Sequence, residues 1–346
     1  MNSDMPTSFQ DSLSHLTTRM VDLLWHQWSS IGVAGYPRPG DDWIVDPEAL
    51  LLATTRFGRH DSRLMDESID WLAKFGRRIS LQRLQGLHRS WPGVADPRVL
   101  AAIAEVLGQQ VAHRKWRVLA DPAPEAYPPE SLFIRSDGTP AIHSGDAEPV
   151  FAKHGLLREK LELRGMSQPP DPRARETLIF TLRALLGVNA RAEILAWLLT
   201  HDSGHPAAIA RSTGYFSKSI QQILNEMEES AQIISVRHGR EKHFRVRATD
   251  WQFLLPPPAD GQSSFPRWVD WMPLFAAITR FAETLALPGI DHQSEHFQAI
   301  QLREALDEAM PALIRAGVSN ELRSSRDQRG AHLIQSLLAD LDLLLG

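Results

Sequence analysis

The side chains best suited to chemistry lie on one face of a helix predicted to start at Phe216 or Ser217. This polar face carries Ser217, Lys218, Gln221, Gln222 and Asn225. On the opposite face Ile220, Ile223, Leu224 and Met227 form an apolar stripe, typical of a helix that packs on a core. Amide and ammonium groups on an exposed helix can hydrogen-bond the edges of DNA bases. The spacing therefore predicts base contacts from this surface.

A second group of candidates lies between Ser235 and Arg247, where five cations stand against one anion, Glu241. Cations predicted to contact DNA phosphates are Arg237, Arg240, Lys242 and Arg245. The charge distribution agrees, because Lys and Arg outnumber Asp and Glu by 15 to 11 over residues 151–250, while acids predominate on both sides and the net charge is −5. The alternative is a basic hairpin that only keeps an exposed strand from aggregating.

Three short helices and a hairpin are predicted to position these two groups. Residues 191–200 have the apolar spacing of a helix with one buried face. A polar turn then leads to Pro206, which suits the first position of a second helix, and Gly214 suits its end. After the third helix, residues 233–236 and 243–247 have the composition of two strands, joined by a tight turn that contains a glycine.

The stretch from Arg191 to Arg247 resembles the winged helix-turn-helix of bacterial transcription regulators of the ArsR and MarR kind. The matching segments are EILAWLL, AAIARSTGYFSKSIQQILNEMEE and IISVRHGREKHFRV, and together they cover about a sixth of the chain. The resemblance implies that the third helix enters the major groove of double-stranded DNA and that the hairpin, or wing, lies along the phosphate backbone. Phe216 departs from the pattern, because these regulators usually carry a small capping residue there.

Length and composition indicate a cytoplasmic, mainly α protein with more than one folded region. The chain has 346 residues, 43% hydrophobic and 23% charged, and no apolar run long enough to span a membrane. The absence of cysteine excludes disulfides, thiolate metal sites and cysteine nucleophiles. We expect a winged helix-turn-helix flanked by helical bundles: an N-terminal all-α domain (1–120), a linker (121–149), a winged-helix domain with leading helices (150–250) and a C-terminal helical domain (251–346).

Helical spacing and start signals place the flanking helices. Asp46 and Asp96 each precede a proline, the combination expected where a helix begins. The N-terminal helices are predicted over about residues 13–30, 47–57, 61–75, 80–90 and 97–115. The later ones are predicted over about residues 150–165, 174–187, 268–287, 292–316 and 332–345. Six tryptophans in the N-terminal part are expected mainly in its core, although a self-association surface would draw on the same residues.

Other polar clusters give weaker signals. His292, Glu295 and His296 form H-x-x-E-H, a spacing used by one class of zinc peptidases, although an exposed helix start explains it more simply. The His-rich turn at 201–205 has the same simple explanation. Residues 56–63 could form a phosphate site, the corner of a second helix-turn-helix, or a turn with internal ion pairs. No Gly-rich phosphate loop and no G-x-S-x-G occurs, so we expect no cofactor, no metal and no catalytic residue.

These observations predict a sequence-specific transcription regulator that binds double-stranded DNA as a homodimer. Its two third helices would enter successive major grooves about one helical turn apart. Two alternatives stay open: a winged helix that serves as a protein-interaction module in a larger assembly, and an enzyme within the N-terminal helices. A regulator also needs an input, so an effector ligand is expected, but no residue identifies it.

Overall fold

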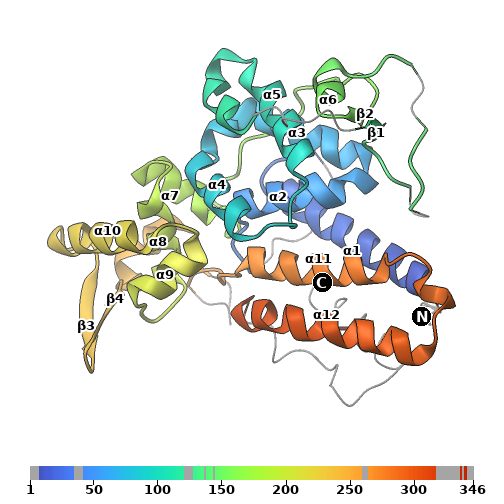
Figure 1. Cartoon of the computed structure of the whole chain (residues 1–346). Helices are drawn as coiled ribbons and strands as arrows, with labels where there is room; N and C mark the ends of the chain where they lie inside the picture. The colour runs from blue at the N-terminus through green and yellow to red at the C-terminus, as the bar shows by residue number, and fades with distance from the viewer. Residues whose placement is uncertain are drawn as a thin grey trace.

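The computed structural model describes residues 8–34, 42–120, 128–135, 138–142, 145–258, 264–316, 336 and 339–340. Over these residues the chain is mainly helical and has two small two-stranded sheets (Figure 1). The mainly α class expected from the sequence is confirmed. None of the helices in the described part is both long and apolar enough to cross a bilayer. The helix predicted over 332–345 lies almost entirely outside the described residues.

Four of the N-terminal helices begin where the sequence places their start signals, whereas the first begins at Phe9, four residues before the predicted start, because Ser8 caps it. They are α1 (Phe9–Ser30), α2 (Pro47–Phe57), α3 (Ser62–Phe75), α4 (Leu81–Ser90) and α5 (Pro97–Gly108), with 3-10 turns η1 (Gly58–His60), η2 (Gly76–Arg78) and η3 (Val111–Leu119). The carboxylates of Asp46, Asp61 and Asp96 each accept a hydrogen bond from a first-turn N–H. The predicted extension of the last helix to Lys115 is wrong. Arg117 donates its Nε–H to the carbonyl of Gly108 at 2.8 Å, so a side chain satisfies this end of α5.

Tryptophans fill the centre of this bundle. The rings of Trp28 and Trp71 meet edge to face with centroids 5.6 Å apart. Their buried indole N–H groups donate to the Thr54 hydroxyl and the Ile31 carbonyl, so no polar atom of these rings is left unpaired. Trp116 is also fully buried. The core role expected for tryptophan is confirmed at these three positions.

An irregular segment connects the bundle to the central helices. It contains β1 (Glu130–Ser131), α6 (Pro149–Lys153) and β2 (Leu156–Leu157), with β1 and β2 paired in parallel. The helix predicted over 150–165 is wrong beyond Lys153, because long-range contacts hold the chain extended there. Besides the strand pairing, the guanidinium of Arg158 forms a bidentate ion pair with Asp66 at 2.7 and 3.0 Å.

The remaining elements are the central helices, a hairpin and a C-terminal pair of helices. The central ones are α7 (Leu178–Leu186), α8 (Ala190–Leu199), α9 (Pro206–Thr213), α10 (Ser217–Glu229), β3 (Ile234–His238), β4 (Glu241–Arg245) and η4 (Ala248–Leu254), followed by α11 (Trp271–Leu285), η5 (Ile290–His292) and α12 (Glu295–Ala316). Helix α11 lies along α1 and α2, with α12 on its outer side (Figure 1). Trp271 donates its indole N–H to the Ile44 carbonyl at 2.9 Å.

One continuous cluster of buried apolar residues runs through the bundle, α7 to α10, and the α11–α12 pair. The predicted domain boundaries at residues 121, 150 and 251 stay predictions. Across the described residues, the three regions share this core rather than being joined by exposed linkers alone.

Candidate nucleic-acid interface

Helices α8, α9 and α10 form a three-helix unit whose turns follow the sequence signals. The side chain of Asn189 accepts the N–H of Arg191 at 2.9 Å and caps α8. A ring nitrogen of His205 accepts the N–H of Ala207 at 3.2 Å, at the start of α9. Gly214 ends α9 in a left-handed conformation, with φ of +77°, and donates its N–H to Ala210. The helix bounds predicted around Pro206 and Gly214 are confirmed.

Helix α10 presents the predicted polar face. Ile220, Leu224 and Met227 are buried on its inner side. Of the predicted base-contacting residues, Ser217, Lys218 and Gln222 are exposed, and Gln221 and Asn225 are half-buried. The structure therefore brings all five onto one helix, on the side away from the core.

Neighbouring polar side chains order the amides of this face. The amide nitrogen of Gln221 donates to the Asn225 side-chain oxygen at 3.3 Å, and that of Gln222 donates to Glu226 at 3.0 Å. The last turn of α10 carries Glu226, Glu228 and Glu229, of which the first two form ion pairs with Arg191 and Lys242. The N-terminal half of α10 has no acidic side chain, so it is the half better suited to approach DNA.

The β3–β4 hairpin is fastened to the helices at its base. Ile234 pairs with Arg245 and His238 with Glu241, and Gly239 supplies the positive φ of +63° at the turn. Phe244 is fully buried, and its backbone exchanges two hydrogen bonds with Gly204, at 2.8 and 2.9 Å. The loop before α9 thus pairs with β4 through one antiparallel bridge. Figure 1 shows the hairpin projecting from one end of the molecule beside α10.

Lys242 ties the hairpin to α10. Its ammonium forms an ion pair with Glu228 and lies 4.8 Å from the centroid of the Phe244 ring. The Ser235 hydroxyl donates to the other oxygen of Glu228 at 2.5 Å. Lys242 and Ser235 together hold the pKa of Glu228 below its usual range. The structure therefore places Lys242, predicted to contact phosphate, against an acid of α10.

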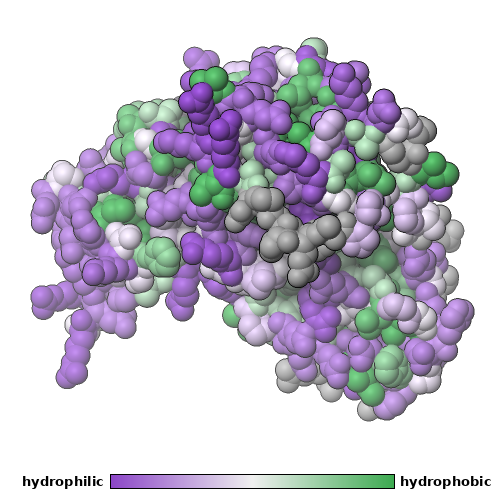
Figure 2. All heavy atoms as spheres, turned by 45° about the horizontal axis from the view of Figure 1, so that its top comes forward, coloured by the Kyte–Doolittle hydropathy of each residue, from purple (hydrophilic) through white to green (hydrophobic). Residues whose placement is uncertain are grey.

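The other predicted cations of the hairpin are unpaired. Arg237, Arg240 and Arg245 are exposed, and their guanidinium groups make no hydrogen bond or ion pair with any residue that the structure describes. Arg247 differs, because it pairs with Asp250 at 3.0 Å. In Figure 2, hydrophilic side chains cover most of the end of the molecule that carries α10 and the hairpin. Cations thus line both faces and the tip of the hairpin.

A buried ionic network, which sequence reasoning missed, joins α9 to the bundle. Arg83 of α4 is 2% exposed, and its guanidinium bonds Asp46 at 2.5 Å and Glu48 at 2.6 Å. Its Nε–H donates to the carbonyl of Thr213, the last residue of α9, at 2.6 Å. The three-helix unit is therefore held by a buried charge of the neighbouring bundle.

Arg183 of α7 completes this network. It bonds Glu48 at 2.7 Å and Glu193 of α8 at 2.5 Å. Burial alone would lower the pKa of Arg183, but the two carboxylates raise it well above its ordinary value. Burial raises the pKa of Glu193. The one signal in the sequence was a carboxylate inside the otherwise apolar run of α8, and nothing nearby identified its partner.

The weaker polar clusters do not form sites among the described residues. His292, Glu295 and His296 are exposed, and the described part of the chain contains no group of three or more His, Cys, Asp or Glu side chains placed to hold a metal. Two arginines of the 56–63 turn form ion pairs with other elements, Arg56 with Glu283 and Arg59 with Asp96 and Glu130, and Arg63 lies over the Trp25 ring. The ion pairs expected there are present, but they join the turn to other elements and are not internal to it.

No protein-family model matches the chain, and no curated protein and no solved structure is significantly similar to it.

Proposed function

We propose that the protein is a sequence-specific regulator of transcription that binds double-stranded DNA through a winged helix-turn-helix. Helices α8, α9 and α10 and the β3–β4 hairpin are its parts, in the chain order of that motif. The observation that carries the proposal is that three arginines without ion-pair partners in the described part of the chain lie on the hairpin, beside an exposed polar face of α10. Exposed cations beside the amides of α10 suit the combination of phosphates and base edges that duplex DNA presents.

The arrangement divides the interface into two kinds of contact. Lys218, Gln221 and Gln222, on the N-terminal half of α10, would meet base edges in the major groove, where amides read adenine and lysine reads guanine. Arg237, Arg240 and Arg245 would meet phosphates. Lys242 would contribute indirectly by fixing the angle between the hairpin and α10. Asn225 and Ser217 flank the base-reading residues at the two ends of the face.

A regulator of this kind would act as a homodimer on a pseudo-palindromic operator. Each protomer has one α10, and two such helices about one helical turn apart read both half-sites. The dimer matters energetically, because each protomer offers only three free hairpin arginines. Six phosphate contacts in the dimer would then make the affinity for DNA depend more steeply on salt than three contacts from one protomer.

Electrophoretic mobility shifts or fluorescence anisotropy on the DNA upstream of its own gene, at increasing salt, test this function. We expect log affinity to fall against log salt with a slope of roughly −5 for a dimer and roughly −3 for one protomer. Replacing Arg237, Arg240 and Arg245 together by Gln should remove most of that slope. The matched control is Arg77→Gln, an exposed arginine outside the interface. Binding that is absent, or independent of salt, would refute the proposal.

A further inference from the structure

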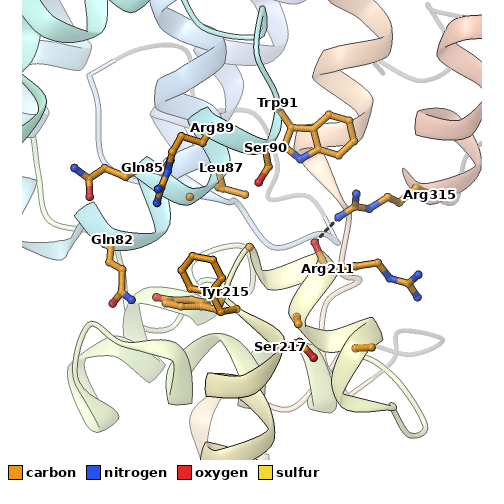
Figure 3. Close-up of a pocket in the computed structure, with 15 residues that line it drawn as sticks. Gln82, Gln85, Leu87, Arg89, Ser90, Trp91, Arg211, Tyr215, Ser217 and Arg315 are labelled. Carbon is orange, nitrogen blue, oxygen red and sulfur yellow. Dashed lines mark hydrogen bonds between the residues drawn. The ribbon is translucent and has the colours of Figure 1, made fainter.

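A groove of about 690 Å³ separates α4 from the turn that joins α9 to α10. On one wall Gln82, Gln85 and Arg89 stand at helical spacing along α4, and on the other lie Arg211 and the first residues of α10 (Figure 3). The floor is closed by the contact between the two helices: a Cβ at Gly86 would lie 3.0 Å from the Gly214 carbonyl oxygen. The volume falls within the range of small-molecule sites.

The charge of the groove suits an anion. Three arginines line it, and none of its lining residues is an Asp or a Glu. Arg315 of α12 is held in place, because its guanidinium lies 5.0 Å from the centroid of the Trp91 ring and donates to the Arg211 carbonyl. Arg89 and Arg211 are exposed and form no ion pair with any described residue. The Nε–H of Arg89 donates to the Gln85 carbonyl at 3.3 Å, which leaves its terminal NH2 groups, and the guanidinium of Arg211, to bind oxygens of a phosphate.

The groove also holds aromatic surface that has no partner. Phe216 is 69% exposed and occupies the capping position of α10, where its side chain makes no capping hydrogen bond. Tyr215 beside it is fixed by the hydrogen bond between its hydroxyl and that of Ser80, at 3.0 Å. An exposed phenyl ring beside guanidinium groups can stack on a nucleobase while the arginines bind its phosphate.

We propose that this groove binds a free nucleotide. Figure 3 shows the guanidinium groups of Arg89 and Arg211 on opposite sides of the groove, so these exposed side chains would turn inward to hold its phosphate, and its base would stack on Phe216. Because Phe216 and Ser217 also begin the helix proposed to read DNA, a bound nucleotide would change the affinity for DNA, and this consequence rests on the proposed function. The nucleotide is then the effector of the regulator.

Isothermal titration calorimetry on the full chain tests the site without any DNA. The probes are the 5′-monophosphates of adenosine, guanosine, cytidine and uridine, each alone, with adenosine and inorganic phosphate as partial ligands. We expect at least one monophosphate to bind more than tenfold tighter than either partial ligand. Arg89→Gln and Arg211→Gln should each weaken it by about tenfold to a hundredfold, since each loses a charge-assisted hydrogen bond. Arg77→Gln, an exposed arginine outside the groove, should bind like the wild type.

Phe216→Ala separates stacking from charge. It should weaken nucleotide binding by about fivefold to a hundredfold and leave inorganic phosphate binding unchanged. Phe253→Ala, at a ring 71% exposed outside the groove, should change neither. Thermal melts confirm that each variant folds.

The inference would be overturned if no nucleotide bound at about 1 mM, or if inorganic phosphate bound as tightly as the nucleotides. Equal losses of nucleotide affinity in Arg77→Gln and Arg89→Gln would also overturn it. If the wild type bound no nucleotide and Arg89→Gln lost duplex binding, the groove would be assigned to the DNA backbone instead. Nucleotide binding by a protein that binds no duplex would support the site and refute the proposed function.

Discussion

At the scale of single residues, the hairpin arginines differ in what they can do. Arg240 lies in the hairpin turn with no partner among the described residues, whereas Arg247 is neutralised by Asp250 and Lys242 by Glu228. A cation that already has a carboxylate partner gains less from a phosphate, because the existing pair must be broken first. Cation count alone would therefore overstate the phosphate contacts that the proposed function gives this segment.

The difference predicts how single substitutions affect DNA binding. Arg240→Ala should weaken binding to all sequences about equally and reduce the salt slope by about 1. Gln221→Ala should instead relax the preference at one base pair, by about 1 to 3 kcal/mol. Selection from a randomised duplex pool measures both effects. Arg247→Ala is the control and should change the slope less than Arg240→Ala does. A selective effect of Arg240→Ala on one sequence would contradict this assignment.

His60 gives the protein a pH-dependent stability. Burial, together with Arg59 and Arg56, lowers the pKa of His60 to about 4, and its Nδ1 has no hydrogen-bond partner. The unfolded chain therefore takes up this proton more readily than the folded one. The contribution of neutral His60 to the free energy of unfolding is complete above pH 6.5. It declines as the pH falls towards 4, by at most about 1.4 kcal/mol per pH unit.

Urea unfolding between pH 7 and pH 5 tests this prediction. The wild type should lose stability on acidification faster than His60→Gln does. Other titrating groups, including His88 and His201, whose pKa values are also lowered by burial, occur in both proteins and cancel in the difference. Parallel pH profiles for the two proteins would show that His60 is not the source of the sensitivity.

At the scale of elements, the attachment of the hairpin depends on close contact at Gly204. A Cβ at this position would lie 2.2 Å from the indole ring of Trp197, and the backbone of Gly204 also pairs with Phe244. Neither the helix nor the hairpin can shift without losing the other contact. Because Gly204 has no side chain, its backbone can contact Trp197 of α8 and pair with Phe244 of the hairpin at once, and these two contacts set the orientation of the hairpin relative to α8.

Gly204→Ala should destabilise the protein by about 1 to 3 kcal/mol, as overpacking does in other cores. It should also weaken DNA binding at temperatures where the variant stays folded, since the hairpin must move. Gly239→Asn is the control, because asparagine tolerates a positive φ and a side chain there meets open space. Thermal melts with duplex titrations measure both quantities. Equal melting temperatures for the two variants would mean that the loop adapts easily.

Local signals predicted some elements well and others poorly, for a physical reason. Proline and capping residues fixed the starts of α2, α5 and α9, because those signals act within one turn. The extended chain at 156–158 was missed, because its partners, Ser131 and Asp66, are far away in the sequence. In the candidate site, the polar face of α10 was predictable from spacing, but the pairing of Lys242 with Glu228 was not.

At the scale of the whole molecule, the buried network centred on Glu48 connects α2, α4, α7 and α8. Glu48 is fully buried and accepts hydrogen bonds from Arg83, Arg183 and the N–H of Ser80. Arg83 and Arg183 each have a second carboxylate partner, Asp46 and Glu193, but Glu48 is the one that both share. Glu48→Gln should cost about 2 to 5 kcal/mol of unfolding free energy, because the buried amide NH2 would face donors where a carboxylate oxygen now accepts their hydrogen bonds.

Glu283→Gln is the matched control for this prediction. It breaks the ion pair between Glu283 and Arg56, whose side chains are 44% and 32% exposed respectively. This substitution should cost less than about 1 kcal/mol. Urea unfolding curves give both values. Similar losses in the two variants would mean that the network contributes little to holding the central helices on the bundle.

Under the proposed function, the bond from Arg83 to the end of α9 also bears on the operator, because it restricts how far α9 and α10 can turn relative to the bundle. Two protomers of the proposed homodimer would then suit only a narrow range of separations between their α10 helices. An extra five base pairs between half-sites, about half a turn, would turn the second half-site to the opposite side of the duplex. Such an insertion should abolish binding by the second protomer, whereas a full-turn insertion should restore part of it.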